Sequence, residues 1–356
     1  MRRYDDGRYA ALLKGTGALT LRTDPPGAEV ICRRYDRSVD LAWPMAERQV
    51  LGTTPLEGLA LESGSYLLTL RYPGRRDTRY PVFLPRGHHW DSGPQPIPLF
   101  SEADIGEGVV YVPAGPFVQG GDLQSTDSRP RSEPWVDGFF LSVLPVTMQQ
   151  YSDFVSALHG RDPEQAWSRV PRQESGLTSS GGQYWERPSR DGSYAVPERD
   201  RDGDPWSPLW PVYAVSWEDA GAYAAWCSEK DGLRWALPTE QQWEKANRGV
   251  DGRIFPWGDG FDPTLCKMRD SRQGRPQPEP VGSFATDISP YGVRDLAGGV
   301  RDWCGDHHYG GDPKRRPLRG GAWSANVRNC RAAYRHGNVP WYVLTHNGFR
   351  LARPLP

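Results

Sequence analysis

The residue types best suited to redox or metal chemistry are few and far apart in this sequence. Its five cysteines are scattered along the chain: Cys32, Cys227, Cys266, Cys304 and Cys330. Their odd number, wide spacing and lack of a CxxC pair argue against a zinc ribbon or a disulfide framework. The seven histidines form two adjacent pairs and three single residues. Adjacent histidines point to opposite faces of a strand, so they are poor co-ligands. We expect no catalytic residue, no metal and no cofactor.

Asparagines are concentrated in the C-terminal part of the chain. Asn326, Asn329, Asn338 and Asn347 lie there, and the rest of the chain holds only Asn247. Around them stands a chemically mixed set of thirteen residues, each encodable by a codon that ends in C or T: Ser324, Ala325, Asn326, His336, Gly337, Asn338, Val339, Tyr342, Val343, Leu344, Thr345, His346 and Asn347.

The codons of asparagine are AAC and AAT. Varying their first two bases gives codons that still end in C or T. None of the thirteen residues is Lys, Glu, Gln or Met, which codons of this kind cannot encode. Trp341 joins the set because its codon is one base from the arginine codon AGG. A plainer alternative stays open, since asparagine is common in turns and the codon set is permissive. The pattern favours a segment, residues 322–347, whose side chains are exchanged to bind a ligand.

Such a binding face requires a fixed backbone beneath it. Exposed substitutions usually shift stability by less than about 0.5 kcal/mol, whereas changes in a core cost several. We therefore expect the exchangeable side chains to face outward, with Trp341, Tyr342 and His346 offering rigid contact area. The ligand would be a protein or a glycan. Six residues are expected to anchor the backbone: Trp323, Arg331, Tyr334, Arg335, Phe349 and Arg350.

Three helices that could support this face are marked by their capping residues. The first is expected after Thr147, with Gln150 three residues later and Gly160 at its end. The second follows Ser216 in "VSWEDAGAYAAWCSEKDG", and the third follows Thr239 in "LPTEQQWEKANRG". Beyond the third helix we expect loops and short strands held by aromatic residues.

The first part of the chain has the alternation of half-buried strands. "ALTLRTD", "AEVICRRY" and "YLLTLRY" indicate strands, and "DPPGAEV" indicates a turn before one of them. We expect a small β-sandwich over residues 16–100, after a tail at 1–15, with a linker near "HHWDSGPQPIPLFSEADIGEG". The motifs "PPGAEV", "GTTPL" and "GSYLLTLRYPG" resemble PEGA-type domains, which implies a structural or adhesive spacer.

Charge and hydropathy limit the possible partners and location. The net charge of −1 gives no general attraction to nucleic acid or to a membrane. No run of apolar residues approaches the length of a membrane-spanning helix, and the N-terminus has no signal-peptide core. We expect a soluble cytoplasmic protein that binds neither nucleic acid nor membrane.

Phrases across residues 105–356 resemble the formylglycine-generating-enzyme (sulfatase-modifying factor) family. They occur in the family's order: "VPAGPFVQGG", "PVTMQQYSDFV", "YAVSWEDAGAYAAWCS", "ALPTEQQWEKANRG", "FPWGDG", "SPYGVRDLAGGVRDW", "LRGGAW" and "GFRLAR". The resemblance implies an α+β fold similar to a C-type lectin domain, with helices beside a twisted sheet of short strands.

The same resemblance implies chemistry that this sequence departs from. The family's enzymes hold copper through two nearby cysteines, but the matching segment has only Cys330. Relatives that bind non-haem iron use three histidines, for which no suitable spacing exists here. Where members bind calcium near "GNVWEW", this chain has Gly299 in place of the asparagine, leaving Asp302 and Asp306 as possible ligands or as loop-capping carboxylates.

The lectin-like fold together with the codon-consistent tail resembles the variable proteins of diversity-generating retroelements. In such prokaryotic or phage systems a reverse transcriptase mutates template adenines, and the altered copy replaces the end of a target gene. The resemblance, which extends to a thermostable member, implies ligand binding without catalysis. A binding or scaffold protein that is not diversified and an oxidoreductase of the same fold are the alternatives.

Overall fold

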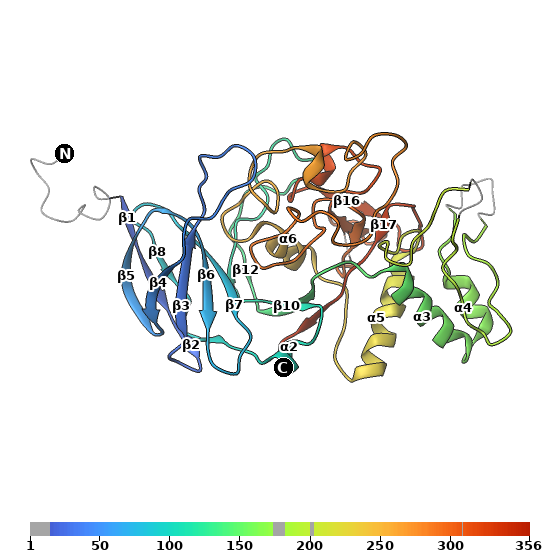
Figure 1. The fold of residues 1–356 in the computed structure, drawn as a ribbon, viewed down its shortest axis with the longest axis horizontal. Helices are drawn as coiled ribbons and strands as arrows, with labels where there is room; N and C mark the ends of the chain where they lie inside the picture. The colour runs from blue at the N-terminus through green and yellow to red at the C-terminus, as the bar shows by residue number, and fades with distance from the viewer. Residues whose placement is uncertain (1–14, 174–181, 200–202, 308) are drawn as a thin grey trace, which may run out of the picture.

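The computed structural model describes residues 15–173, 182–199, 203–307 and 309–356. Residues 1–14 of the expected tail and His308 lie outside this part of the chain. Figure 1 shows the β-rich N-terminal part at one end, α3, α4 and α5 at the other, and loops around α6 between them.

The N-terminal part is a small β-sandwich, as the alternating sequence predicted. Its four-stranded sheet has the order β4-β3-β6-β7, and its three-stranded sheet has the order β5-β1-β8. The strands are β1 Thr16–Leu21, β2 Thr23–Asp24, β3 Glu29–Arg34, β4 Gln49–Thr53, β5 Leu56–Glu62, β6 Gly64–Arg71, β7 Thr78–Leu84, β8 His89–Asp91 and β9 Ile97–Pro98.

The segment expected to be a linker is instead part of the folded structure. Its residues form β8, which pairs in parallel with β1, and β9, which pairs in parallel with β2. A short helix, α2 (Glu102–Ile105), follows, with a capping box at Ser101. Main-chain pairing therefore outweighs the proline and glycine content that suggested a linker.

The sandwich packs closely against the rest of the chain, whereas a spacer would stand apart from it. One hydrophobic core contains Leu68 and Val82 of the sandwich together with Trp243. At the loop between β3 and β4 the two parts touch so closely that a Cβ on Gly260 would lie 1.6 Å from the Asp40 carbonyl oxygen. The two parts therefore share a continuous interior.

The three helices expected from their capping residues are confirmed. They are α3 (Met148–His159), α5 (Trp217–Asp231) and α6 (Glu240–Arg248), and each begins with a capping box at Thr147, Ser216 or Thr239. The sequence did not indicate α4 (Pro163–Arg169), although Asp162 caps it and Pro163 opens it. Two short 3-10 turns, η2 (Pro263–Leu265) and η3 (Val327–Cys330), complete the helical content of the described residues.

Short strands make up the sheets of the second part. Their orders are β10-β13-β18, β11-β12 and β16-β15-β14-β17. The strands are β10 Val109–Val112, β11 Gly115–Pro116, β12 Trp135–Val136, β13 Phe139–Ser142, β14 Arg301–Trp303, β15 Arg316–Arg319, β16 Arg335–Asn338, β17 Asn347–Gly348 and β18 Ala352–Pro354. This α+β arrangement of few helices and short strands agrees with the expected fold class.

The four-stranded sheet β16-β15-β14-β17 carries the C-terminal segment, and its two faces differ. Trp303 pairs with Leu318, and Leu318 pairs with His336, so these three side chains share one face. Trp303 and Leu318 pack in the core that includes α3 and α5. Asp302 and Arg319 alternate to the opposite face, which α6 covers.

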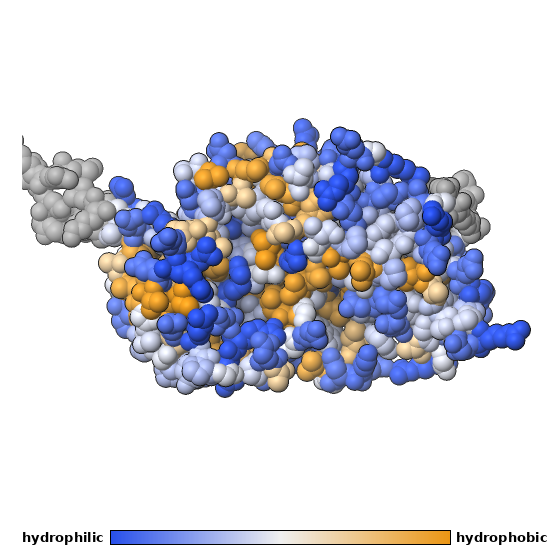
Figure 2. Space-filling view, viewed as in Figure 1, coloured by the Kyte–Doolittle hydropathy of each residue, from blue (hydrophilic) through white to orange (hydrophobic). Residues whose placement is uncertain are grey.

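Apolar side chains on one surface of the molecule form patches across its middle, with hydrophilic residues above and below them (Figure 2).

Within the described residues, no helix has both the length and the apolar character needed to cross a bilayer.

Candidate functional site

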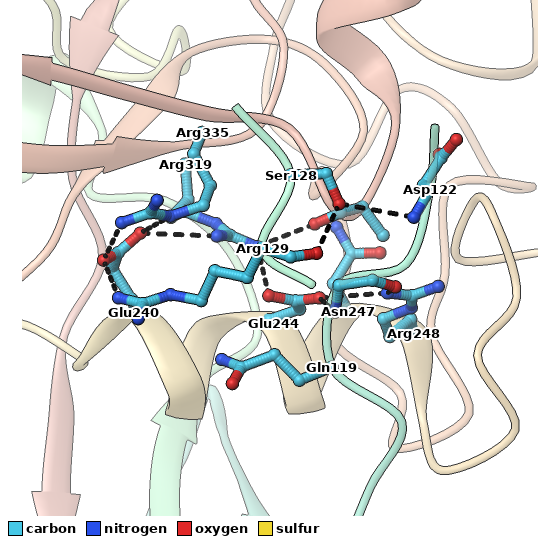
Figure 3. Close-up of polar contacts among 12 residues, drawn as sticks. Gln119, Asp122, Ser128, Arg129, Glu240, Glu244, Asn247, Arg248, Arg319 and Arg335 are labelled. Atoms are coloured by element: carbon cyan, nitrogen blue, oxygen red, sulfur yellow. Dashed lines mark hydrogen bonds and ion pairs between the residues drawn. The ribbon is translucent and has the colours of Figure 1, made fainter. Parts of the chain in front are cut away.

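A buried network of charges fixes the sheet beneath the C-terminal segment (Figure 3). Glu240 and Glu244 lie one turn apart on α6 and are each 1% exposed. Arg335 of β16 donates two hydrogen bonds to Glu240 at 2.7 and 2.8 Å. Arg319 of β15 donates to Glu244 at 2.8 Å. The network therefore ties both strands to α6.

The arginines of this network act strongly on the pKa of Glu240. Burial alone would raise the pKa of Glu240. The Arg335 hydrogen bond and the charges of Arg319, Arg335 and Arg129 outweigh burial and lower the pKa to about 2. Buried charges are tolerated only when they are paired and hydrogen-bonded, and Glu240 meets both conditions.

The other expected anchors also hold the backbone in place. Arg350 donates to the Asp302 carboxylate at 2.6 Å, and both side chains are at most 1% exposed. Arg331 makes a two-pronged contact with Asp122 at 2.6 and 2.9 Å. Trp323 Nε1 donates to the Thr345 carbonyl at 2.8 Å. Tyr334 and Phe349 are buried, so the expectation that these six residues are anchors is confirmed.

The predicted exchangeable residues are not all displayed outward. Asn326 and Trp341 are exposed, and Trp341 keeps 58% of its surface accessible. Eight others are half-buried: Ser324, His336, Asn338, Val339, Tyr342, Leu344, Thr345 and His346. For the remaining four the expectation of outward display is wrong, because they are buried: Ala325, Gly337, Val343 and Asn347.

Each of these four is enclosed for a local reason. Gly337 packs against the ring of Tyr309, and a Cβ at that glycine would lie 2.3 Å from Cγ of the ring. Asn347 lies in β17 and is 0% exposed. Val343 is 3% exposed, and Ala325 sits in a tight turn closed by a main-chain hydrogen bond to the Ala322 carbonyl. Exchange at these positions must therefore respect packing.

A cleft of about 410 Å³ opens beside the C-terminal segment. Thr345 and the anchor Trp323 line it from this segment. The other lining residues come from two loops: Gln173, Tyr184, Trp206, Tyr213, Arg275, Pro276, Gln277 and Pro278. Sequence reasoning missed these residues, although the tryptophans and tyrosines scattered through residues 183–213 could have drawn attention to that loop. A concave, aromatic wall beside exchangeable residues is suited to holding a ligand.

Two thiols of the kind that the implied copper site requires lie side by side, but both are enclosed. The fold brings Cys266 next to Cys330, a neighbour that the sequence could not reveal, and both are 0% exposed in one apolar cluster. The Cys330 hydrogen bond and burial raise the pKa of the Cys266 thiol well above its usual range. A Cβ on Gly321 would lie 2.9 Å from the Cys330 sulfur. The thiols are sealed from any substrate.

The two carboxylates considered for calcium have other roles in the structure. Asp302 Oδ2 accepts hydrogen bonds from Trp243 Nε1 and Arg350 Nε at 2.8 and 2.6 Å. Asp306 Oδ2 accepts from the Glu240 main-chain N–H at 2.6 Å, at the first turn of α6. Asp306 therefore caps the start of α6, whereas Asp302, in β14, pairs with side chains rather than capping a loop. No group of three or more His, Cys, Asp or Glu within the described ranges is arranged to hold a metal ion.

Comparison with known proteins gives the family. The model of the sulfatase-modifying factor enzyme 1-like domain matches residues 98–355. The mouse protein "Inactive C-alpha-formylglycine-generating enzyme 2" is 30% identical over 271 residues, which cover 68% of this chain and 85% of the mouse protein. The "Formylglycine-generating enzyme" of Thermomonospora curvata is 28% identical, covering 72% of this chain and 96% of that protein.

A solved structure supports the fold. PvdO from Pseudomonas aeruginosa superposes with a TM-score of 0.52 at 22% identity, covering 69% of this chain and 94% of PvdO. The expected C-type lectin-like fold of the formylglycine-generating type, preceded by a small β-sandwich, is therefore confirmed. By this match and by its similarity to the mouse protein, the chain belongs to the sulfatase-modifying factor enzyme 1-like domain family.

Proposed function

We propose that this protein binds a protein or glycan ligand through its C-terminal segment and catalyses no reaction. We further propose that a diversity-generating retroelement exchanges the side chains of that segment. The observation that carries the proposal is that residues 322–354 contain both exposed exchangeable residues and buried anchors. The predicted exchangeable residues include the exposed Asn326 and Trp341, whereas Arg335 and Arg350 form buried ion pairs.

Local geometry supports ligand binding at this segment. Trp341 and Tyr342 stand edge to face with ring centroids 6.1 Å apart, and Trp341 projects into solvent. Rigid aromatic side chains supply contact area at a small loss of conformational entropy, as in antibody loops. The cleft beside Thr345 adds a concave surface. An exposed aromatic side chain and a cleft that takes lining residues from the same segment both suit contact with a partner.

The proposal that catalysis is absent is supported by the sealed thiols of Cys266 and Cys330. The name of the mouse relative describes that protein as inactive, which is consistent with this proposal. Another relative is named as an enzyme, so a direct assay is required. Stoichiometric copper or iron in the purified chain, together with oxidation of a cysteine-containing peptide, would overturn the proposal.

The DNA beside the gene tests diversification. A near-copy of the codons for residues 320–350, with AAC or AAT at the thirteen positions whose residues fit codons ending in C or T, should lie next to a reverse-transcriptase gene. The copy should differ from the gene mainly at template adenines, and it should encode the anchors Trp323, Arg335 and Phe349 unchanged. A neighbourhood that lacks both the copy and the reverse transcriptase would favour a binding protein that is not diversified.

A further inference from the structure

Arg301 carries a positive charge that no carboxylate in the described chain balances. Its main-chain N–H donates to the His346 carbonyl at 2.8 Å, but within the described residues its guanidinium forms no hydrogen bond or ion pair. Its Cζ lies 5.6 Å from the centroid of the Tyr334 ring. Burial lowers the pKa of Arg301, and the groups that oppose this effect are Tyr334 and Cys330 rather than an Asp or Glu. A half-buried guanidinium without a counter-ion is unfavourable.

A second unpartnered polar group lies directly beside Arg301. Strands β14 and β17 run in parallel with Arg301 opposite Asn347, so both side chains project from the same face of the sheet. Asn347 is 0% exposed, yet neither its Oδ1 nor its Nδ2 has a hydrogen-bond partner among the described residues. Buried amides almost always have partners. An unpaired cation and an unpaired buried amide therefore occupy adjacent positions on one face of the sheet.

The charge of Arg301 acts on the side chains of two histidines, His336 and His346. Burial, then the charges of Arg301 and Arg315, lower the pKa of His336 to about 4, against the opposing effect of Asp127. Burial, Arg301 and His336 lower the pKa of His346 to about 3. Both rings are therefore neutral near pH 7. Each can donate one N–H there without adding a second positive charge.

We propose that four residues form a carboxylate-binding site, called the Arg301 site below: Arg301, His336, His346 and Asn347. This inference rests on the proposed function, because three of the four belong to the predicted binding segment. The guanidinium presents a planar fork that matches two carboxylate oxygens, and Asn347 Nδ2 supplies a further donor. Arg301 itself lies outside residues 322–347, so the cation would persist while its neighbours are exchanged.

The charge of the site favours a carboxylate over a phosphate. At neutral pH one guanidinium and two uncharged imidazoles supply a single positive charge, which a carboxylate balances. A phosphate monoester carries a charge of roughly −1.5 to −2 and would remain partly unpaired in a half-buried site. The carboxylate could belong to a free small acid or to a peptide, and these two sources share the same recognition chemistry.

The test is an NMR titration of the histidine side chains in the full-length wild-type chain. Sodium acetate is the first probe, with sodium chloride at equal ionic strength as its control. We expect saturable shifts of the His336 and His346 ring signals with acetate and none with chloride. The signals of His159, at the end of α3 and hydrogen-bonded to Tyr194, should not shift. Shifts that do not saturate, or that chloride reproduces, would show that acetate has no specific site there and would overturn the proposal.

A matched pair of variants assigns the binding to Arg301. Arg301→Gln removes the charge but keeps hydrogen-bonding groups, and it should weaken acetate binding by about tenfold or more. Arg48→Gln removes an exposed charge next to β4, outside the predicted binding segment, and should leave acetate binding unchanged. Equal binding by the two variants would contradict the assignment. If Arg301→Gln does not fold, as judged by far-UV circular dichroism, the wild-type titration decides alone.

Two peptides distinguish the sources of the carboxylate. A short peptide with a free C-terminal carboxylate should shift the same signals if the site reads peptide ends, and the amidated peptide should not. Shifts with acetate alone would restrict the site to small free acids. No shift with either acetate or the peptide acid would overturn the inference while leaving the proposed function to its own test, the template copy in the flanking DNA.

Discussion

The buried ion pair between Arg350 and Asp302 offers a sharp test of the framework. Arg350→Met removes the guanidinium, which donates to Asp302 at 2.6 Å and also to the carbonyls of Val143, Arg294 and Asp295 at 2.8–3.2 Å. Asp302 would then keep only the hydrogen bond from Trp243 in a site where it is 1% exposed. Removing one partner of a buried pair costs about 3–5 kcal/mol because the other charge stays buried.

The loss of stability is measured by urea unfolding followed by tryptophan fluorescence. Asp302→Asn in combination with Arg350→Met removes both charges but keeps an oxygen that can accept from Trp243. The double variant should therefore be more stable than Arg350→Met alone. Trp341→Ser, on the predicted binding face, is the matched control and should change stability by less than about 0.5 kcal/mol. A loss below about 1 kcal/mol for Arg350→Met, or an equal loss for Trp341→Ser, would refute the reasoning.

Three further predictions follow from the same contacts. Gly337→Val forces a side chain into the Tyr309 ring and should destabilise the protein by about 1–3 kcal/mol in urea unfolding, although valine is compatible with the exchange codons. The pKa of Glu240 is depressed to about 2 from its ordinary 4.5, so its contribution of about 3 kcal/mol is present above pH 4.5 and is lost as the pH falls towards 2. The midpoint of urea unfolding should fall over that pH range. Glu240→Gln should reduce this dependence of the midpoint on pH. The same dependence in the variant would contradict the ion pairs of Glu240. Cys266 and Cys330 should react with a thiol reagent only after unfolding, and rapid labelling of the native chain would show that they are accessible.

The sequence was sufficient to predict where three helices begin, because contacts within the first turn of each helix determine its start. Thr147, Ser216 and Thr239 each start a helix because a hydroxyl and a side chain three residues later satisfy the free N–H groups of the first turn. The anchors in "RNCRAAYR" and "GFRLAR" were predicted because an exchangeable face requires a fixed backbone, and the burial of Arg335, Phe349 and Arg350 meets that requirement.

Long-range contacts explain what the sequence could not show. The Arg335–Glu240 pair joins residues that are 95 positions apart, and Cys266 meets Cys330 only because two loops fold together. Codon composition cannot tell a buried position from an exposed one, so it placed Val343 and Asn347 on the face. Their burial depends on how the loop before β17 closes against the sheet.

The most direct test of the central claim is a substitution library over residues 322–347 scored for folded protein by resistance to proteolysis. We predict that Ser324, Asn326, Asn338 and Trp341 accept most residues encoded by NNC and NNT codons. We also predict that the buried positions reject most of them, namely Ala325, Gly337, Val343 and Asn347. Broad intolerance at the first group would contradict a display face on a fixed framework.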